Sequence, residues 1–137
     1  MKLLAYEVDK RSFLGIFNED ETWVYPISAA GMEYRSMKDL IREAGPSEME
    51  MLDYISKKAP GDVMGAAPVD EIRVVSPIAE PDQDIICLGI NYMDHAEESA
   101  RFEKREFERP EKAIYFSKRV NRTNDPDGII PAHKNLT

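Results

Sequence analysis

The chain has 137 residues, 26 acidic and 18 basic, and its formal net charge at pH 7 is −8. This length suits one ordinary domain, or one small domain with part of another, and a hydrophobic content of 42% supports a packed core. The negative charge argues against binding to nucleic-acid phosphates. No apolar run approaches the roughly 20 residues that span a bilayer. We therefore expect no membrane segment, no signal peptide and a cytoplasmic location.

The first 27 residues predict an antiparallel meander of three short strands. Residues 2–8, 12–17 and 22–27 are rich in aliphatic and aromatic side chains. The polar connections between them have hairpin length. Trp23 is expected to pack in this sheet, and a platform for a ligand is the alternative.

Two helices are predicted next. Ser36 with Asp39 resembles a capping box at the start of the first helix, and the Gly-Pro pair at 45–46 ends it. Ser47 with Glu50 resembles a second capping box, which predicts that the second helix starts there.

Residues 59–68 are rich in proline, glycine and alanine, which predicts a linker. We place the domain boundary in this linker. Residues 1–66 would form a supporting domain without an acid–base constellation, and residues 67–137 would begin a second domain.

The second domain is expected to contain short strands separated by polar connections. Strands are predicted at about 71–76, 84–88 and 112–116. A polar loop at 117–128 ends in a clear turn signal, and residues 129–131 would begin another strand or an extended segment.

The stretch Ile85–Glu98 contains the side chains best suited to acid–base chemistry. It starts as an apolar run typical of a buried strand, passes through Gly89, and then becomes polar and titratable. Cys87 is the only cysteine and is expected to be a buried free thiol. His95 and Glu98 are three residues apart, so on a helix they would share one face and could share a proton. An ordinary surface pair is the alternative.

Residues 96–109 are densely charged and contain few apolar anchors. Two interpretations stay open for this segment, a solvated surface helix and a mobile lid over the site. The lid interpretation predicts that residues 98–109 are poorly ordered without a ligand.

The ten residues Gly89–Glu98 resemble the signature of a known family. They read Gly-Ile-Asn-Tyr-Met-Asp-His-Ala-Glu-Glu, which is similar to the G-x-N-Y-x-x-H-A-x-E signature of the fumarylacetoacetate hydrolase family. Residues 74–78 resemble the family's strand before the signature. Residues 113–118, which end in Phe-Ser-Lys, and residues 129–131 resemble its continuation. The resemblance covers residues 69–137 well and the earlier part only loosely.

The resemblance implies an α+β protein. A small N-terminal α/β domain, made of the antiparallel meander and two helices, would precede the first strands of a mixed β-roll catalytic domain. Members of the family hydrolyse or cleave C–C bonds, decarboxylate or isomerise small 2-oxo acids and 1,3-dicarbonyl compounds, and the isomerases and acylpyruvases are the most similar. A small 2-oxo acid substrate and a homodimer are therefore expected.

The resemblance also implies roles for individual residues. His95 would be the general base and Glu98 would orient it, while Tyr92, Lys118 and Arg119 would bind the substrate. An ordinary surface lysine is an equal alternative for Lys118. A divalent metal, Mg²⁺ or Mn²⁺, would act as a Lewis acid on the substrate.

The family's metal ligands are a Glu-x-Glu pair and a later aspartate, which are expected beyond Thr137. No residue of this chain is predicted to bind the metal, so the chain is expected to be an inactive N-terminal portion of such an enzyme. The alternative is a non-catalytic binding or interaction module that retains the histidine loop.

Overall fold

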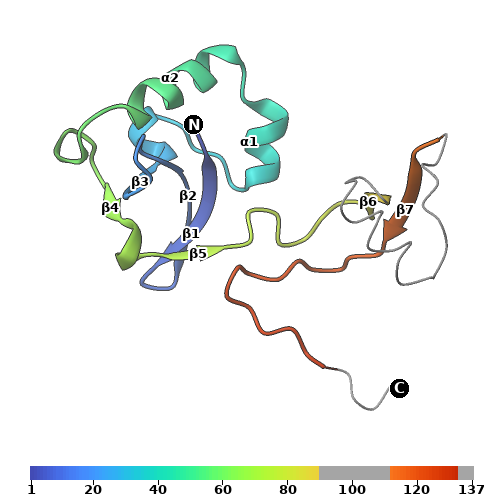
Figure 1. Cartoon of the computed structure of the whole chain (residues 1–137). Helices are drawn as coiled ribbons and strands as arrows, with labels where there is room; N and C mark the ends of the chain where they lie inside the picture. Colours follow the sequence, from blue (N-terminus) through green and yellow to red (C-terminus); the bar gives the residue numbers. More distant parts are fainter. Residues whose placement is uncertain (90–111, 133–137) are drawn as a thin grey trace, which may run out of the picture. The chain divides into compact units, whose positions relative to one another are not determined.

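The computed structural model describes residues 1–89 and 112–132 of the protein (Figure 1). The chain divides into two compact units. Met1–Ala79 and Thr123–Thr137 form the first unit, and Glu80–Arg122 form the second. This division into compact units does not test the expected domain boundary near residue 66, which stays a prediction.

A five-stranded antiparallel sheet organises the first unit, in the order β4-β3-β2-β1-β5. Its strands are β1 (Leu3–Val8), β2 (Arg11–Phe17), β3 (Trp23–Pro26), β4 (Ala67–Pro68) and β5 (Arg73–Val75). The predicted meander is thus confirmed, and the chain forms a small α+β domain. The curled sheet and its two helices can be followed in Figure 1.

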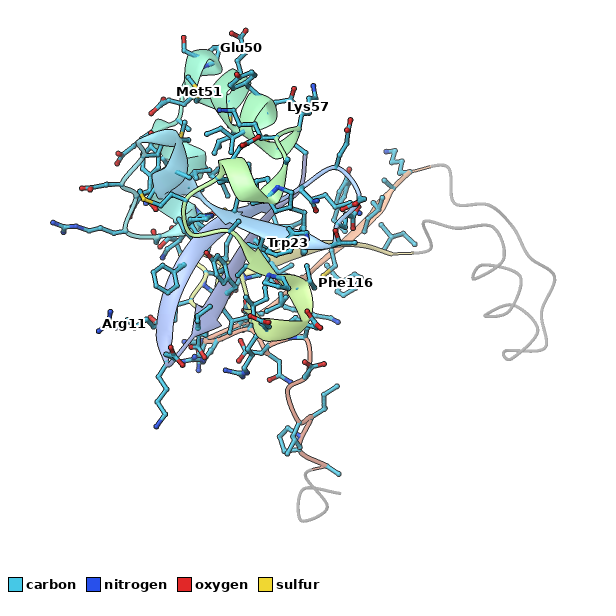
Figure 2. The ribbon with its side chains drawn as sticks, turned by 90° about the vertical axis from the view of Figure 1, so that its left-hand side faces the viewer. Arg11, Trp23, Glu50, Met51, Lys57 and Phe116 are labelled. Carbon is cyan, nitrogen blue, oxygen red and sulfur yellow. The ribbon has the colours of Figure 1, made fainter. Side chains whose placement is uncertain are left out.

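Apolar side chains cover both faces of this sheet. Ile16 lies opposite Tyr25 in the β2–β3 register, and both belong to the larger buried cluster, which includes residues of both helices. Leu4 and Tyr6 belong to a smaller buried cluster with Val24. Trp23 packs against the larger cluster, as predicted (Figure 2).

The first helix, α1 (Met37–Glu43), begins as predicted. The backbone N–H of Asp39 donates to Ser36 Oγ over 3.2 Å, which satisfies one of the unpaired donors at the helix start. Met37 and Leu40 are buried, whereas Ile41 is exposed. The extended conformation of Ala44 ends the helix before the Gly-Pro pair.

The second helix, α2 (Pro46–Ser56), begins differently from the prediction. Gly45 is the N-cap, and Glu48 rather than Glu50 accepts its backbone N–H, over 2.6 Å. Pro46 explains the shift, because its fixed φ and missing N–H suit the first helical position. Ser47 therefore lies inside the helix. Met51 on α2 and Lys57, which directly follows the helix, are both exposed (Figure 2).

The segment expected to be a linker packs into the first unit. Val63 is buried in the larger cluster, and β4 pairs with β3, so that Val24 lies opposite Ala67. Three short 3-10 helices, Ile27–Ala30 (η1), Pro60–Asp62 (η2) and Val69–Glu71 (η3), complete the connections. Proline and glycine here shape tight turns within the fold and do not mark a free connection.

The second unit contains an antiparallel pair, β6 (Ile85–Gly89) and β7 (Ile114–Lys118). Both strands were predicted, but β7 starts two residues later than expected and includes Lys118. The prediction of a buried strand at 85–88 is wrong for the described residues, because Ile86 is 74% exposed and Cys87 is only half-buried. Within this unit, no other described strand or helix packs over the pair.

The last described residues return to the first unit. Gly128 donates its N–H to the carbonyl oxygen of Asp125 over 2.9 Å, which confirms the predicted turn. Residues 129–131 lie outside any strand, and Ile129 and Ile130 are exposed. The expected lid at 98–109 lies outside the described residues.

Candidate functional site

The predicted site residues fall within the sequence range of the second unit. Tyr92, His95 and Glu98 lie outside the residues that the structure describes. The structure does describe the strand that leads to them, because β6 ends at Gly89, directly before the rest of the signature. The predicted catalytic roles of His95 and Glu98 therefore stay predictions.

Lys118 lies at the other end of the same strand pair. It is the last residue of β7 and lies opposite Ile85, whereas Gly89 lies opposite Ile114. Lys118 is four positions after Ile114 along the strand, which corresponds to about 13 Å. The structure therefore does not place Lys118 beside the strand end from which the signature continues.

The two strands define which side chains share a face. Directly opposed residues point to the same side of a sheet, so Lys118 shares a face with Ile85, Cys87 and Phe116. Arg119 follows directly after β7, and both basic side chains are exposed. A charged group at the rim of an apolar face can contact a small anion that lies over that face.

A basic segment surrounds these two residues, and the site prediction missed it as a whole. Residues 112–124 contain Lys112, Lys118, Arg119 and Arg122 and no acidic residue, in a chain with 26 acids. No ion pair joins any of these four side chains to another described residue. The sequence alone could have revealed the segment, through the local absence of Asp and Glu in an acidic chain.

The described residues offer no metal centre. No group of three or more His, Cys, Asp or Glu side chains among residues 1–89 and 112–132 could hold a metal ion. This finding does not test the ligands expected from the resemblance, because those are expected outside the chain. In the same part of the protein, no helix is long and apolar enough to cross a membrane.

Comparisons with known proteins point to one kind of enzyme. No protein-family model matches the chain. A curated relative, the oxaloacetate tautomerase YisK of Bacillus subtilis (strain 168), is 32% identical over 147 residues that include the whole of this chain. The alignment covers 47% of YisK, so the chain spans about half the length of this relative. The protein is therefore similar, over that half, to an enzyme named for the tautomerisation of oxaloacetate.

Proposed function

We propose that this chain is part of a fumarylacetoacetate hydrolase family enzyme that acts on small 2-oxo acids, with oxaloacetate as the first candidate substrate. The observation that carries the proposal is the 32% identity to oxaloacetate tautomerase YisK along the whole chain. The signature-like residues Gly89–Glu98 support the same class of enzyme. Isomerisation, decarboxylation and C–C hydrolysis are the candidate reactions.

The proposed chemistry centres on His95. Keto–enol tautomerisation moves a proton between the oxygen of a carbonyl group and the carbon next to that group, which requires a group that exchanges protons near neutral pH. Histidine suits this task because its ordinary pKa is about 6.5. Glu98 would orient the imidazole and favour its protonated form, and Tyr92 would contact the substrate.

The geometry of the strand pair permits Lys118 to join this site. The chain from Gly89 to His95 can span up to about 20 Å, and this is more than the roughly 13 Å between the ends of β7. We propose that Lys118 and Arg119 bind a carboxylate of the substrate. The charge of residues 112–124 supports this proposal, because an acidic protein would otherwise repel a dianionic substrate.

A divalent metal belongs to the proposal, but not to the described residues. Mg²⁺ or Mn²⁺ would supply Lewis acidity to the 2-oxo acid when bound. The described residues do not fit such an ion, and we propose that carboxylates elsewhere in the complete protein hold it. Residues 1–137 alone would then have no measurable activity on 2-oxo acids.

We further propose that the complete protein is a cytoplasmic homodimer. Apolar side chains on both faces of the β6–β7 pair support an additional contact, since Ile85 and Phe116 on one face and Ile86 and Tyr115 on the other are exposed. Neither nucleic acid nor a membrane is a proposed partner.

The test is an assay of the complete protein that contains this chain. Enol-oxaloacetate is followed spectrophotometrically as it converts to the keto form, with Mg²⁺, with Mn²⁺ and after treatment with a chelator. Metal-dependent acceleration is expected. If neither oxaloacetate nor other 2-oxo acids react, but calorimetry detects their binding, the non-catalytic module is the correct alternative.

A further inference from the structure

Thr123 joins the two segments of the first unit that precede and follow residues 80–122. Its backbone N–H donates to the carbonyl oxygen of Ala79 over 2.8 Å, and its hydroxyl donates to the carbonyl oxygen of Ile78 over 2.8 Å. Ser76 Oγ lies 2.5 Å from Thr123 Oγ1. Because the threonine hydroxyl has one proton, Ser76 must be the donor of this bond. The three bonds hold the chain that leaves β5 against the chain that returns to it.

Asp125 makes a second tie two residues later. Its Oδ1 accepts the backbone N–H of Ser76 over 2.9 Å, and its Oδ2 accepts Arg73 Nη2 over 2.6 Å. Arg73 also donates to Glu7 on β1 over 2.9 Å, so a single guanidinium joins the returning segment to two neighbouring strands. The pKa of Arg73 is raised, first by the bond to Glu7 and then by the charge of Asp125.

These contacts hold together the two chain segments that precede and follow residues 80–122. We call the residues that make this contact, Ser76, Ile78, Ala79, Thr123 and Asp125, the neck. Residues 80–122 include the β6–β7 pair. The same range of the sequence contains each residue of the proposed site.

We propose that Thr123 and Asp125 are positioning residues, which close the neck and thereby stabilise the strand pair that carries the proposed site. The stabilisation of the strand pair rests on the described contacts alone. The consequence for catalysis rests on the proposed function.

The size of the effect follows from loop closure. Without the neck, pairing β6 with β7 must bring together two strands that are separated by 24 residues of an open chain. With the neck closed, only residues 80–84 and 119–122 separate the neck from the β6–β7 pair. The length of chain that pairing must close is therefore about threefold shorter. The closure relation converts this into a pairing constant about fivefold larger.

Hydrogen exchange of the complete protein, read by mass spectrometry, tests the proposal. Thr123→Val removes the hydroxyl, and Asp125→Asn removes the charge that faces Arg73. Because each variant removes only part of the neck, its β6 and β7 amides are expected to exchange faster by up to about fivefold, with β1 and β2 unchanged. Thr123→Ser should restore the slow exchange. Asp127→Asn, in the same turn and exposed, is the matched control and should change nothing.

Two results would overturn the proposal. One is that the amide at position 123 exchanges faster in the variants while the amides of β6 and β7 exchange at the wild-type rate. The other is equal acceleration in all strands, which would indicate general destabilisation of the fold.

The same variants separate this proposal from the proposed function. If the wild-type enzyme converts oxaloacetate, Thr123→Val should lower kcat severalfold and leave the midpoints of its pH profile in place, since the proton-transferring group is unchanged. If kcat is unchanged although exchange accelerates, the positioning role is refuted. A wild-type protein that is inactive on every 2-oxo acid refutes the proposed function, while the exchange result still decides whether the neck stabilises the strand pair.

Discussion

Glu48 organises the start of α2 by accepting two hydrogen bonds. The backbone N–H of Gly45 donates over 2.6 Å, and the hydroxyl of Tyr34 donates over 2.5 Å. The bond from Tyr34, followed by that from Gly45, lowers the pKa of the Glu48 carboxyl. The same bond raises the pKa of Tyr34 to about 12. Both pKa shifts favour an ionised Glu48 and a neutral Tyr34. These are the states in which the Tyr34 hydroxyl donates to the Glu48 carboxylate.

These shifts predict how Glu48→Gln depends on pH. A lowered carboxyl pKa contributes stability above the ordinary value of 4.5, and this is lost as the pH falls through the folded-state pKa. The stability gap between wild type and Glu48→Gln should therefore narrow below about pH 4.5. For Tyr34 the sign is opposite, and its contribution disappears as the pH rises through about 12.

Urea unfolding midpoints of both proteins between pH 3 and pH 7 measure this gap. Glu50→Gln, on the same helix, is the matched control. A gap that stays constant or widens in acid would contradict the assigned bonds.

Individual site residues were only partly accessible from the sequence. The signature points to Tyr92, His95 and Glu98 because their spacing is specific, but spacing does not report a position in space. For Lys118 the sequence suggested a loop, and the structure places it in β7 opposite Ile85. The difference arises because the register between two strands is set by pairing over the whole length of both.

At the scale of elements, the sequence predicted most of the first unit. The meander follows from short runs rich in aliphatic and aromatic residues, and α1 follows from a cap, Ser36, that is encoded locally. The start of α2 was misplaced because a Ser-x-x-Glu pattern at Ser47 competes with the preference of Pro46 for the first helical position. The burial of Val63 could not be predicted, because the proline, glycine and alanine content of residues 59–68 does not show whether a side chain among them reaches the core.

The two serines provide a direct test of these helix starts. Ser36→Ala should lower the free energy of unfolding by about 1 kcal/mol, because it removes an acceptor for the Asp39 N–H. Ser47→Ala should change stability by less than about 0.5 kcal/mol, since alanine is well tolerated inside a helix. Chemical denaturation of both variants measures the difference. If Ser47→Ala lowered the free energy of unfolding more than Ser36→Ala, Ser47 would be the N-cap of α2, as the sequence suggested.

The β6 strand shows a different limit of sequence reasoning. Its apolar run predicted a buried strand, yet Ile85, Ile86 and Leu88 are exposed, as is every residue of β7. Apolar strands of this kind are typical of sheets that are covered on both sides. The sequence thus predicts that other residues pack over the faces of the β6–β7 pair.

At the scale of the whole molecule, the two units differ in how they bury apolar surface. The first unit has a core of fully buried side chains such as Tyr25, Val24 and Leu52. The second unit presents large apolar side chains to solvent, including Tyr115 at 68% exposure. Exposed apolar area of this kind favours association.

We therefore predict that residues 1–137, produced alone, associate through the β6–β7 pair. Sedimentation velocity should show species larger than a monomer. Ile86→Lys should shift the distribution toward the monomer, because a charge would be buried in the contact. Met64→Lys is the control, since Met64 is even more exposed than Ile86 but belongs to the first unit. A compact, stable monomer of the unmodified chain would contradict this prediction.

The central claim is that His95 transfers a proton in a 2-oxo acid enzyme, and His95→Gln in the complete protein tests it most directly. Oxaloacetate turnover is measured together with metal affinity. We expect kcat to fall by about 10²- to 10⁴-fold for His95→Gln, with metal affinity unchanged. Near-normal turnover would contradict the account, and so would a collapse of metal binding, which would make His95 a metal ligand.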